Sequence, residues 1–229
     1  MSGLKVLSAA LAALLLAGCV KLLPDPAEPP RLYALEAGPV ERAPGEHVAA
    51  VAGVAEPEGP QALLGDSIVW RSDGVIAFMA NAAWPGRAAD LLQSMLAETI
   101  TRQGLLDAGV SSRGAGVRAD VEVRWDLTAF DVNEADGALE ARFIAQVRII
   151  STRDRKLLKA EIVEEREAIA DRSGRLAANA LARAAQRGCA RIALMTAEAA
   201  RSAHQAAQAA SAAQATVAGD QPSAASTRR

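Results

Sequence analysis

The sequence predicts an α/β protein of the α+β type, in which a mixed, largely antiparallel sheet is covered by two main helices. Two patterns support this fold class. Apolar and polar residues alternate along 121–128 and 139–149, as expected for strands with one buried face. In 86–103 and 174–201 the apolar residues recur three and four positions apart, which is the period of a helix.

The first part of the folded region is expected to hold short strands. Asp73-Gly74 between two β-prone segments is typical of a tight hairpin turn. A helix over 86–103 follows, because Pro85 suits the first turn and Gly104 suits the end. Four segments bounded by proline, glycine or polar turns are predicted as these strands: 32–35, 47–54, 67–71 and 75–79.

Three longer strands are expected to form a C-terminal meander. Strands 121–128 and 139–149 are followed by a third that begins at 158–162, and short polar loops join them. Their charged face is predicted to be solvated, and the two helices are predicted to cover the other face. Ala185 and Gly188 are small, so the second helix is expected to approach the sheet closely.

Composition limits the classes of partner. The 229-residue chain has a net charge of −2 and no dense run of Lys and Arg, which argues against a nucleic-acid partner. Four parts are predicted: a signal peptide over 1–18, a lipidated Cys with a Pro-rich tether over 19–31, one domain over 32–201, and an unstructured Ala/Ser/Gln-rich tail over 202–229. Alanine favours helix, so the last helix can run on into this tail before it frays.

The N-terminus has the order of a secretory signal peptide: a basic start, an apolar run too short to span a bilayer, and small residues. Its end, Leu16-Ala17-Gly18-Cys19, resembles a bacterial lipobox. That resemblance implies cleavage before Cys19 and acylation of its thiol, palmitate being one of the acyl groups. The alternative is an ordinary signal peptide with an incidental Cys. Val20 and Lys21 follow in place of an Asp retention signal, which favours the outer membrane over the inner membrane.

Catalytic and metal-binding patterns are missing from the sequence. His47 and His204 have no Cys or second His at metal-ligand spacing, so neither a metal nor another cofactor is expected. The carboxylates Glu164, Glu165 and Glu167 are interpreted as the charged edge of a strand. Cys189 is expected to be a small buried side chain, although nearby arginines leave a reactive thiol open. No enzyme activity is predicted.

The most distinctive segment spans residues 66–96. It combines the strand Asp66-Ser-Ile-Val-Trp70, a second strand about eight residues on, and Trp84 at the start of an amphipathic helix. Together with Tyr33 after the Pro-rich tether and the Ala-rich last helix, this order is similar to that of the ABC-type transport auxiliary lipoprotein family. The resemblance covers about residues 19–200.

The resemblance implies a periplasmic α/β domain without enzyme activity. It also implies a partnership with an MCE (mammalian-cell-entry) substrate-binding protein, its permease and its ATPase. The family further suggests a homo-oligomer, because MCE proteins are rings. The reach of the tether, about 40 Å at most, requires the partner to come close to the outer membrane.

Aromatic residues in this segment have two interpretations. Trp70, Phe78 and Trp84 can seat the first helix on the sheet, or Trp84 and Trp70 can contact a partner or a lipid, since aromatics dominate binding hot spots. Arg71 and Arg87 flank them and can hold a phosphate head group or simply be solvated.

We therefore expect an outer-membrane-anchored, non-catalytic accessory subunit of an ABC/MCE transporter that moves lipids or other hydrophobic substrates between the membranes. The competing hypothesis is a stand-alone lipid- or glycan-binding lipoprotein. That role needs a deep apolar pocket, which the scarcity of aromatics (3%) does not favour.

Overall fold

One long strand, β6 (Val121–Ala135), organises the sheet in the computed structural model, which describes residues 28–112 and 116–219. Along one edge, β6 pairs antiparallel with β7 (Ala138–Ser151), and β7 pairs antiparallel with β8 (Leu157–Ile169). This is the predicted meander. Two strands share the other edge of β6, both parallel to it: β2 (Val48–Val54) pairs near its start and β3 (Ser67–Ser72) pairs near its end.

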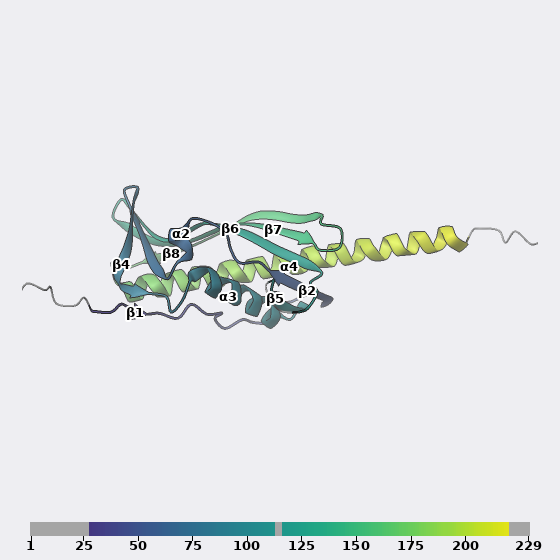
Figure 1. The fold of residues 1–229 in the computed structure, drawn as a ribbon, viewed down its shortest axis with the longest axis horizontal. Helices are drawn as coiled ribbons and strands as arrows, with labels where there is room; N and C mark the ends of the chain where they lie inside the picture. The colour runs from purple at the N-terminus through teal and green to yellow at the C-terminus, as the bar shows by residue number, and fades with distance from the viewer. Residues whose placement is uncertain (1–27, 113–115, 220–229) are drawn as a thin grey trace, which may run out of the picture.

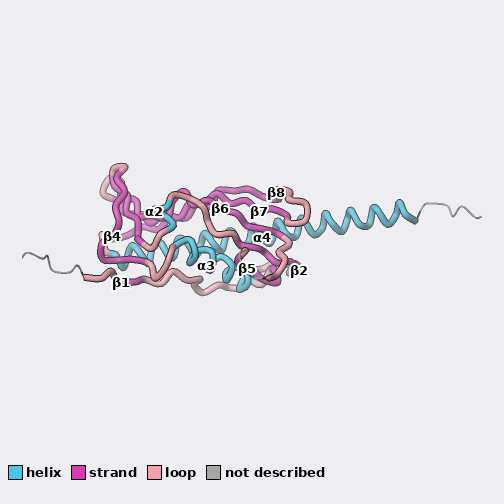
Figure 2. Tube along the Cα trace, in the orientation of Figure 1, coloured by secondary structure: helices cyan, strands magenta, loops and turns pink. Residues whose placement is uncertain are grey.

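The remaining strands extend the two branches of this divided edge. β5 (Leu106–Ser111) lies parallel to β2, and β4 (Val75–Ala83) forms the predicted hairpin with β3. The short β1 (Arg31–Leu32) is parallel to the last two residues of β4. The result is one eight-stranded sheet of mixed direction (Figure 2). The predicted fold class is confirmed.

Two long helices lie on one face of the sheet (Figure 1). α3 (Ala88–Gln103) packs over β5 and β2, whereas α4 (Gly174–Gly219) packs over β8 and β7 and also against α3. α3 ends where Gly104 adopts a left-handed conformation and its N–H donates to the Thr101 carbonyl. A short helix, α2 (Gln61–Leu64), lies in the connection between β2 and β3.

The core lies between the sheet and the two helices, and a bulge in β6 decides which side chains enter it. Up to Leu127 the odd-numbered residues point inward and are buried. The register with β7 shifts between Leu127 and Ala129, after which Phe130 and Val132 are the inward residues. The same shift turns Asp131 to the outer face.

Close contact between α4 and the sheet depends on Gly188. A Cβ atom at this position would lie 2.3 Å from Cε1 of the fully buried Phe143 ring. The adjacent Cys189 is also fully buried. The prediction that small residues let this helix approach the sheet is therefore confirmed.

Several boundaries differ from the sequence-based expectations. The first strand covers only Arg31–Leu32 rather than 32–35, and the strand of β5 was missed. The last helix continues to Gly219, inside the segment 202–229 for which an unstructured tail is predicted. Alanine has the highest helix propensity, so this helix forms although it has little to pack against. Residues 220–229 lie outside the described residues.

Candidate functional site

Trp84 lies in the core between β4 and α3. It is 2% exposed, its ring stacks on Phe130 with centroids 5.7 Å apart, and its backbone N–H donates to the Asp66 carbonyl. Of the two interpretations that the sequence allowed, its burial favours the core. Cys19, the other prominent prediction, lies outside the described residues.

Trp70 is half-buried on β3, within a polar contact that ties the sheet to the start of α4. Its indole N–H donates to the Glu134 carboxylate over 3.2 Å, and the Arg172 guanidinium lies 5.9 Å from the ring centroid. Arg172 also pairs with Glu134. This hydrogen bond from Arg172 is the main reason that the pKa of Glu134 is lowered.

Arg87 and Arg71 both have carboxylate partners. Arg87, immediately before α3, pairs with Glu56 over 2.7 Å and with Asp90 over 3.3 Å. These carboxylates, first of all the hydrogen bond to Glu56, raise the pKa of the Arg87 guanidinium. Arg71 pairs with Asp131 over 3.1 Å. Both arginines thus belong to ion pairs within the chain. The sequence had suggested either contact with a phosphate head group or simple solvation, and neither describes these ion pairs.

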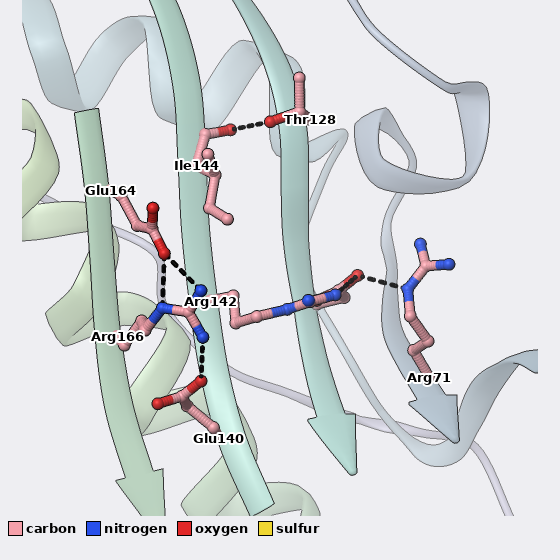
Figure 3. Close-up of polar contacts among 8 residues, drawn as sticks. Arg71, Thr128, Glu140, Arg142, Ile144, Glu164 and Arg166 are labelled. Atoms are coloured by element: carbon pink, nitrogen blue, oxygen red, sulfur yellow. Dashed lines mark hydrogen bonds and ion pairs between the residues drawn. The ribbon is translucent and has the colours of Figure 1, made fainter. Parts of the chain in front are cut away.

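Asp131 is the centre of a buried ionic contact on the outer face of the sheet. Its side chain is fully buried, and Arg142 binds it through two nitrogens at 2.9 and 3.0 Å. Arg71 approaches from the neighbouring strand, so β3, β6 and β7 are joined by one carboxylate (Figure 3). A buried carboxylate needs such partners, because an unpaired one would carry a large desolvation cost.

The next strand continues this pattern. Arg166 of β8 donates to Glu140 of β7 over 2.7 Å and to its neighbour Glu164 over 2.5 Å (Figure 3). These two hydrogen bonds raise the pKa of Arg166. Asp131 and Arg166 are thus each paired with charges of neighbouring strands, so these contacts hold the strands together.

The inner face of β8 is clamped to α4 by ion pairs. Burial disfavours the charged carboxylate of Glu167, but hydrogen bonds from Arg183 and Arg187 outweigh it, and the pKa of Glu167 is lowered. β8 pairs only with β7 among the described strands, so the prediction of an edge strand is confirmed. The prediction that its carboxylates are solvated holds for Glu164 and is wrong for Glu165 and Glu167, which pair with arginines of α4. The clamp consists of Lys159–Glu198, Glu161–Arg191, Glu165–Arg187 and the contacts of Glu167.

The β3–β4 hairpin exposes apolar side chains, which sequence reasoning missed. Phe78 was a core candidate, yet it is 56% exposed, and Val75 and Ile76 beside it are also exposed. The prediction for Phe78 is wrong because the outer half of the hairpin projects past the helices and has no core to face (Figure 1). The signal was the unbroken apolar run over 75–79, which a strand with one buried face does not need.

Comparison with known proteins identifies the fold family. Residues 33–193 match the family described as the ABC-type transport auxiliary lipoprotein component. This match covers more than half of the chain. The chain belongs to this family. The resemblance inferred from residues 66–96 is thereby confirmed.

Two solved structures share the fold of this auxiliary lipoprotein component. A Xanthomonas campestris protein of the family DUF330 has a TM-score of 0.67 at 16% identity, with 76% of this chain and 99% of that chain covered. An uncharacterized protein has a TM-score of 0.57 at 16% identity, with 73% and 99% covered. At this identity the likeness shows the fold alone. No curated protein is a significant match to the sequence.

The auxiliary lipoprotein component offers little for chemistry within residues 28–112 and 116–219. No three His, Cys, Asp or Glu side chains of this part are grouped to hold a metal ion. His47 lies 3.3 Å from Asp107 on the surface. Burial raises the pKa of the Cys189 thiol well above its usual range, so this Cys is the inert side chain that was expected. No helix of the same part has the length and apolarity to cross a membrane.

Two open grooves mark the surface of the described chain. One, of about 550 Å³, lies on the outer face and is lined mainly by charged residues, including Glu58, Arg124 and Asp126. The other, of about 880 Å³, lies between α4 and the turns at the ends of β6–β8, where Leu157 and Leu158 meet the alanines of the helix. The space between sheet and helices, by contrast, is filled with buried side chains.

Proposed function

We propose that the chain is a lipid-anchored, non-catalytic auxiliary subunit of an ABC transporter, held on the periplasmic face of the outer membrane. The observation that carries this proposal is the family match over residues 33–193. The lipobox-like sequence supplies the anchor: Cys19 carries the acyl chains, and residues 20–31 form the tether. Val20 and Lys21 after the Cys support the outer membrane.

The proposed partners are an MCE-domain substrate-binding protein, its permease and its ATPase, which together move lipids or other hydrophobic substrates between the two membranes. Two observations support a docking role for this subunit. In the part of the chain that the structure describes, buried side chains fill the space between sheet and helices, and the buried carboxylate of Asp131 is paired internally. The ATPase would supply the energy. The proposal includes self-association of the subunit around a ring-shaped partner.

Affinity capture from detergent-solubilised membranes tests the partnership. We expect the tagged full-length chain to retain the MCE protein, the permease and the ATPase. A tagged version of an unrelated lipoprotein from the same membrane is the control for trapping in shared micelles. Recovery of the chain without any of the three, even after chemical cross-linking in the membrane, would contradict the proposal.

A stand-alone lipid carrier is the second candidate. The groove of about 880 Å³ favours it, because Leu157 and Leu158 border an apolar wall of α4 while Arg118 and Lys156 supply positive charge. Mass spectrometry of the chain purified under native conditions distinguishes the two. A stoichiometric phospholipid without transporter subunits supports the carrier, and transporter subunits without bound lipid support the docking subunit.

A further inference from the structure

Large exposed apolar side chains gather at one place on the molecule. Val75, Ile76 and Phe78 are 65%, 47% and 56% exposed, and they lie within four residues on the outer part of β4. We call these three residues the apolar tip. Among the residues that the structure describes, the other large exposed apolar side chains are spread singly: Leu32, Val117, Leu157, Ile162 and Leu194. Single exposed residues are ordinary, whereas a cluster marks a contact surface.

The apolar tip is exposed on both faces of the hairpin. Val75 and Ile76 are consecutive in a strand, so their side chains point to opposite faces. A protein partner packed against one face would leave the other face in water. A lipid surface would surround both faces, because it closes around whatever enters it. Two-sided exposure therefore favours a lipid surface as the occupant.

The hairpin lies at the end of the domain where the tether begins. β1 pairs with Ala82 and Ala83 of β4, and β1 starts twelve residues after Cys19. Val75 is seven residues from Ala82 along the strand, a path of about 23 Å. The tether spans at most about 40 Å. A membrane that holds the acylated Cys19 is thus within reach of the apolar tip.

Charges near the turn set the depth of such a contact. Asp73 occupies the turn of the hairpin with a φ of 49°, next to Gly74. A carboxylate is costly in the hydrocarbon core, so this residue must stay among the head groups. The contact is consequently shallow, at the boundary between head groups and acyl chains, where exposed backbone groups of β4 can still bind water.

We propose that the apolar tip is a second membrane contact of this subunit, inserted beside the lipid anchor. The proposal rests on the anchor at Cys19. A second contact would also fix the orientation of the domain relative to the membrane, which a single flexible tether cannot do. With two contacts at the same end, the domain is held at the membrane by the end opposite to the free end of α4 (Figure 1). Because the tether keeps the tip close to the surface, three side chains are enough for binding.

Tryptophan quenching by brominated phospholipids tests the contact. The mature acylated chain is placed on vesicles of phosphatidylethanolamine and phosphatidylglycerol, with a Phe78→Trp sensor at the tip. Ile162→Trp is the matched control, since Ile162 is a similarly exposed apolar residue (58%) on β8 that lines neither groove. The buried Trp84 and Trp125 add a constant background fluorescence, and Trp70 adds a further signal. The fluorescence of the parent chain, which has only these three tryptophans, gives their sum.

We expect bromine to quench the Phe78→Trp chain more than the parent chain, and to quench the Ile162→Trp chain no more than the parent. Adding Val75→Ser or Ile76→Ser should lower the ratio of inserted to free tip about tenfold each, because each removes one apolar side chain from the boundary. These side chains are already exposed, so the variants should keep the urea midpoint of the parent.

Other results would overturn the proposal. An unquenched Phe78→Trp sensor on a vesicle-bound chain refutes the second contact and leaves the anchor intact. A sensor that is shielded from aqueous iodide but not quenched by bromine shows that protein covers the tip. If the chain does not bind vesicles because Cys19 is unmodified, the anchor has failed. The same sensors on a chain coupled through Cys19 to a maleimide lipid then test the apolar tip separately.

Discussion

Replacing Gly188 by alanine tests whether close packing of α4 on the sheet holds the domain together. In a bare helix this change is stabilising by about 1 kcal/mol, because alanine is the better helix former. In the structure the new Cβ would lie 2.3 and 2.4 Å from two carbons of the Phe143 ring. Carbon atoms normally approach no closer than about 3.5 Å, so the overlap exceeds 1 Å.

The ring cannot move out of the way easily. Phe143 is fully buried and packs at 6.3 Å from Trp125 and 6.4 Å from Phe130, measured between ring centroids. We therefore place the cost at the upper end of the range for overpacked cores, about 3 kcal/mol. After the helix gain is subtracted, the free energy of unfolding should fall by about 2 kcal/mol. For a domain of this size, Tm should fall by about 4–8 °C.

Urea unfolding followed by circular dichroism measures this change. Gly86→Ala is the matched control, because nothing lies within 4 Å of its Cβ position, and it should shift stability by less than about 0.5 kcal/mol. Combining Gly188→Ala with Phe143→Leu should recover part of the loss. A Gly188→Ala chain as stable as the parent, or more stable, would refute the packing argument.

Three further predictions concern the charged and buried groups. Asp131→Asn should lower the free energy of unfolding in urea by about 2–3 kcal/mol, because it leaves the Arg142 guanidinium facing an uncharged group in a buried contact. The surface variant Glu140→Gln is the control and should lower it by less than about 1 kcal/mol. The pKa of Glu167 is lowered on folding, so its contribution to stability is present at neutral pH and is lost as the pH falls through the acid range; Glu167→Gln should flatten that part of the stability–pH curve. The buried Cys189 thiol should resist alkylation in the native chain and react in step with urea unfolding; fast native reaction would contradict its burial.

Local patterns in the sequence predicted much of the fold. The Asp73-Gly74 pair located the hairpin turn, and both residues have positive φ there, 49° and 79°. The three- and four-residue period located α3 within two residues of its start and at its last residue. In these cases a residue and its near neighbours determine the conformation, so sequence alone is enough.

Tertiary context decided what the sequence did not show. β5 has no clear alternation, and it forms because it is parallel to β2 and lies under α3. The bulge after Leu127 reverses the faces of β6, so Asp131 leaves the pattern that began at Val121 and meets Arg71 and Arg142 from other strands. Pairings between distant segments of this kind have no local signal.

Burial decides between the two sequence interpretations of Trp84. The residue was a candidate partner or lipid contact, but it lies in the core against Phe130, which is 46 positions away. The apolar tip was missed because an apolar strand was assumed to face a core. The unbroken run over 75–79 was the feature that should have argued against that assumption.

The most direct test of the central claim is the Cys19→Ser chain, expressed in place of the parent in cells that carry the transporter. The account predicts that the folded domain is released into the periplasm and that transport falls together with the membrane-bound fraction. The chain with Cys19 should be found in the outer-membrane fraction and carry acyl groups on that residue. A Cys19→Ser chain that is fully released, yet supports transport as well as the parent, would contradict the claim that this subunit acts through its membrane anchor.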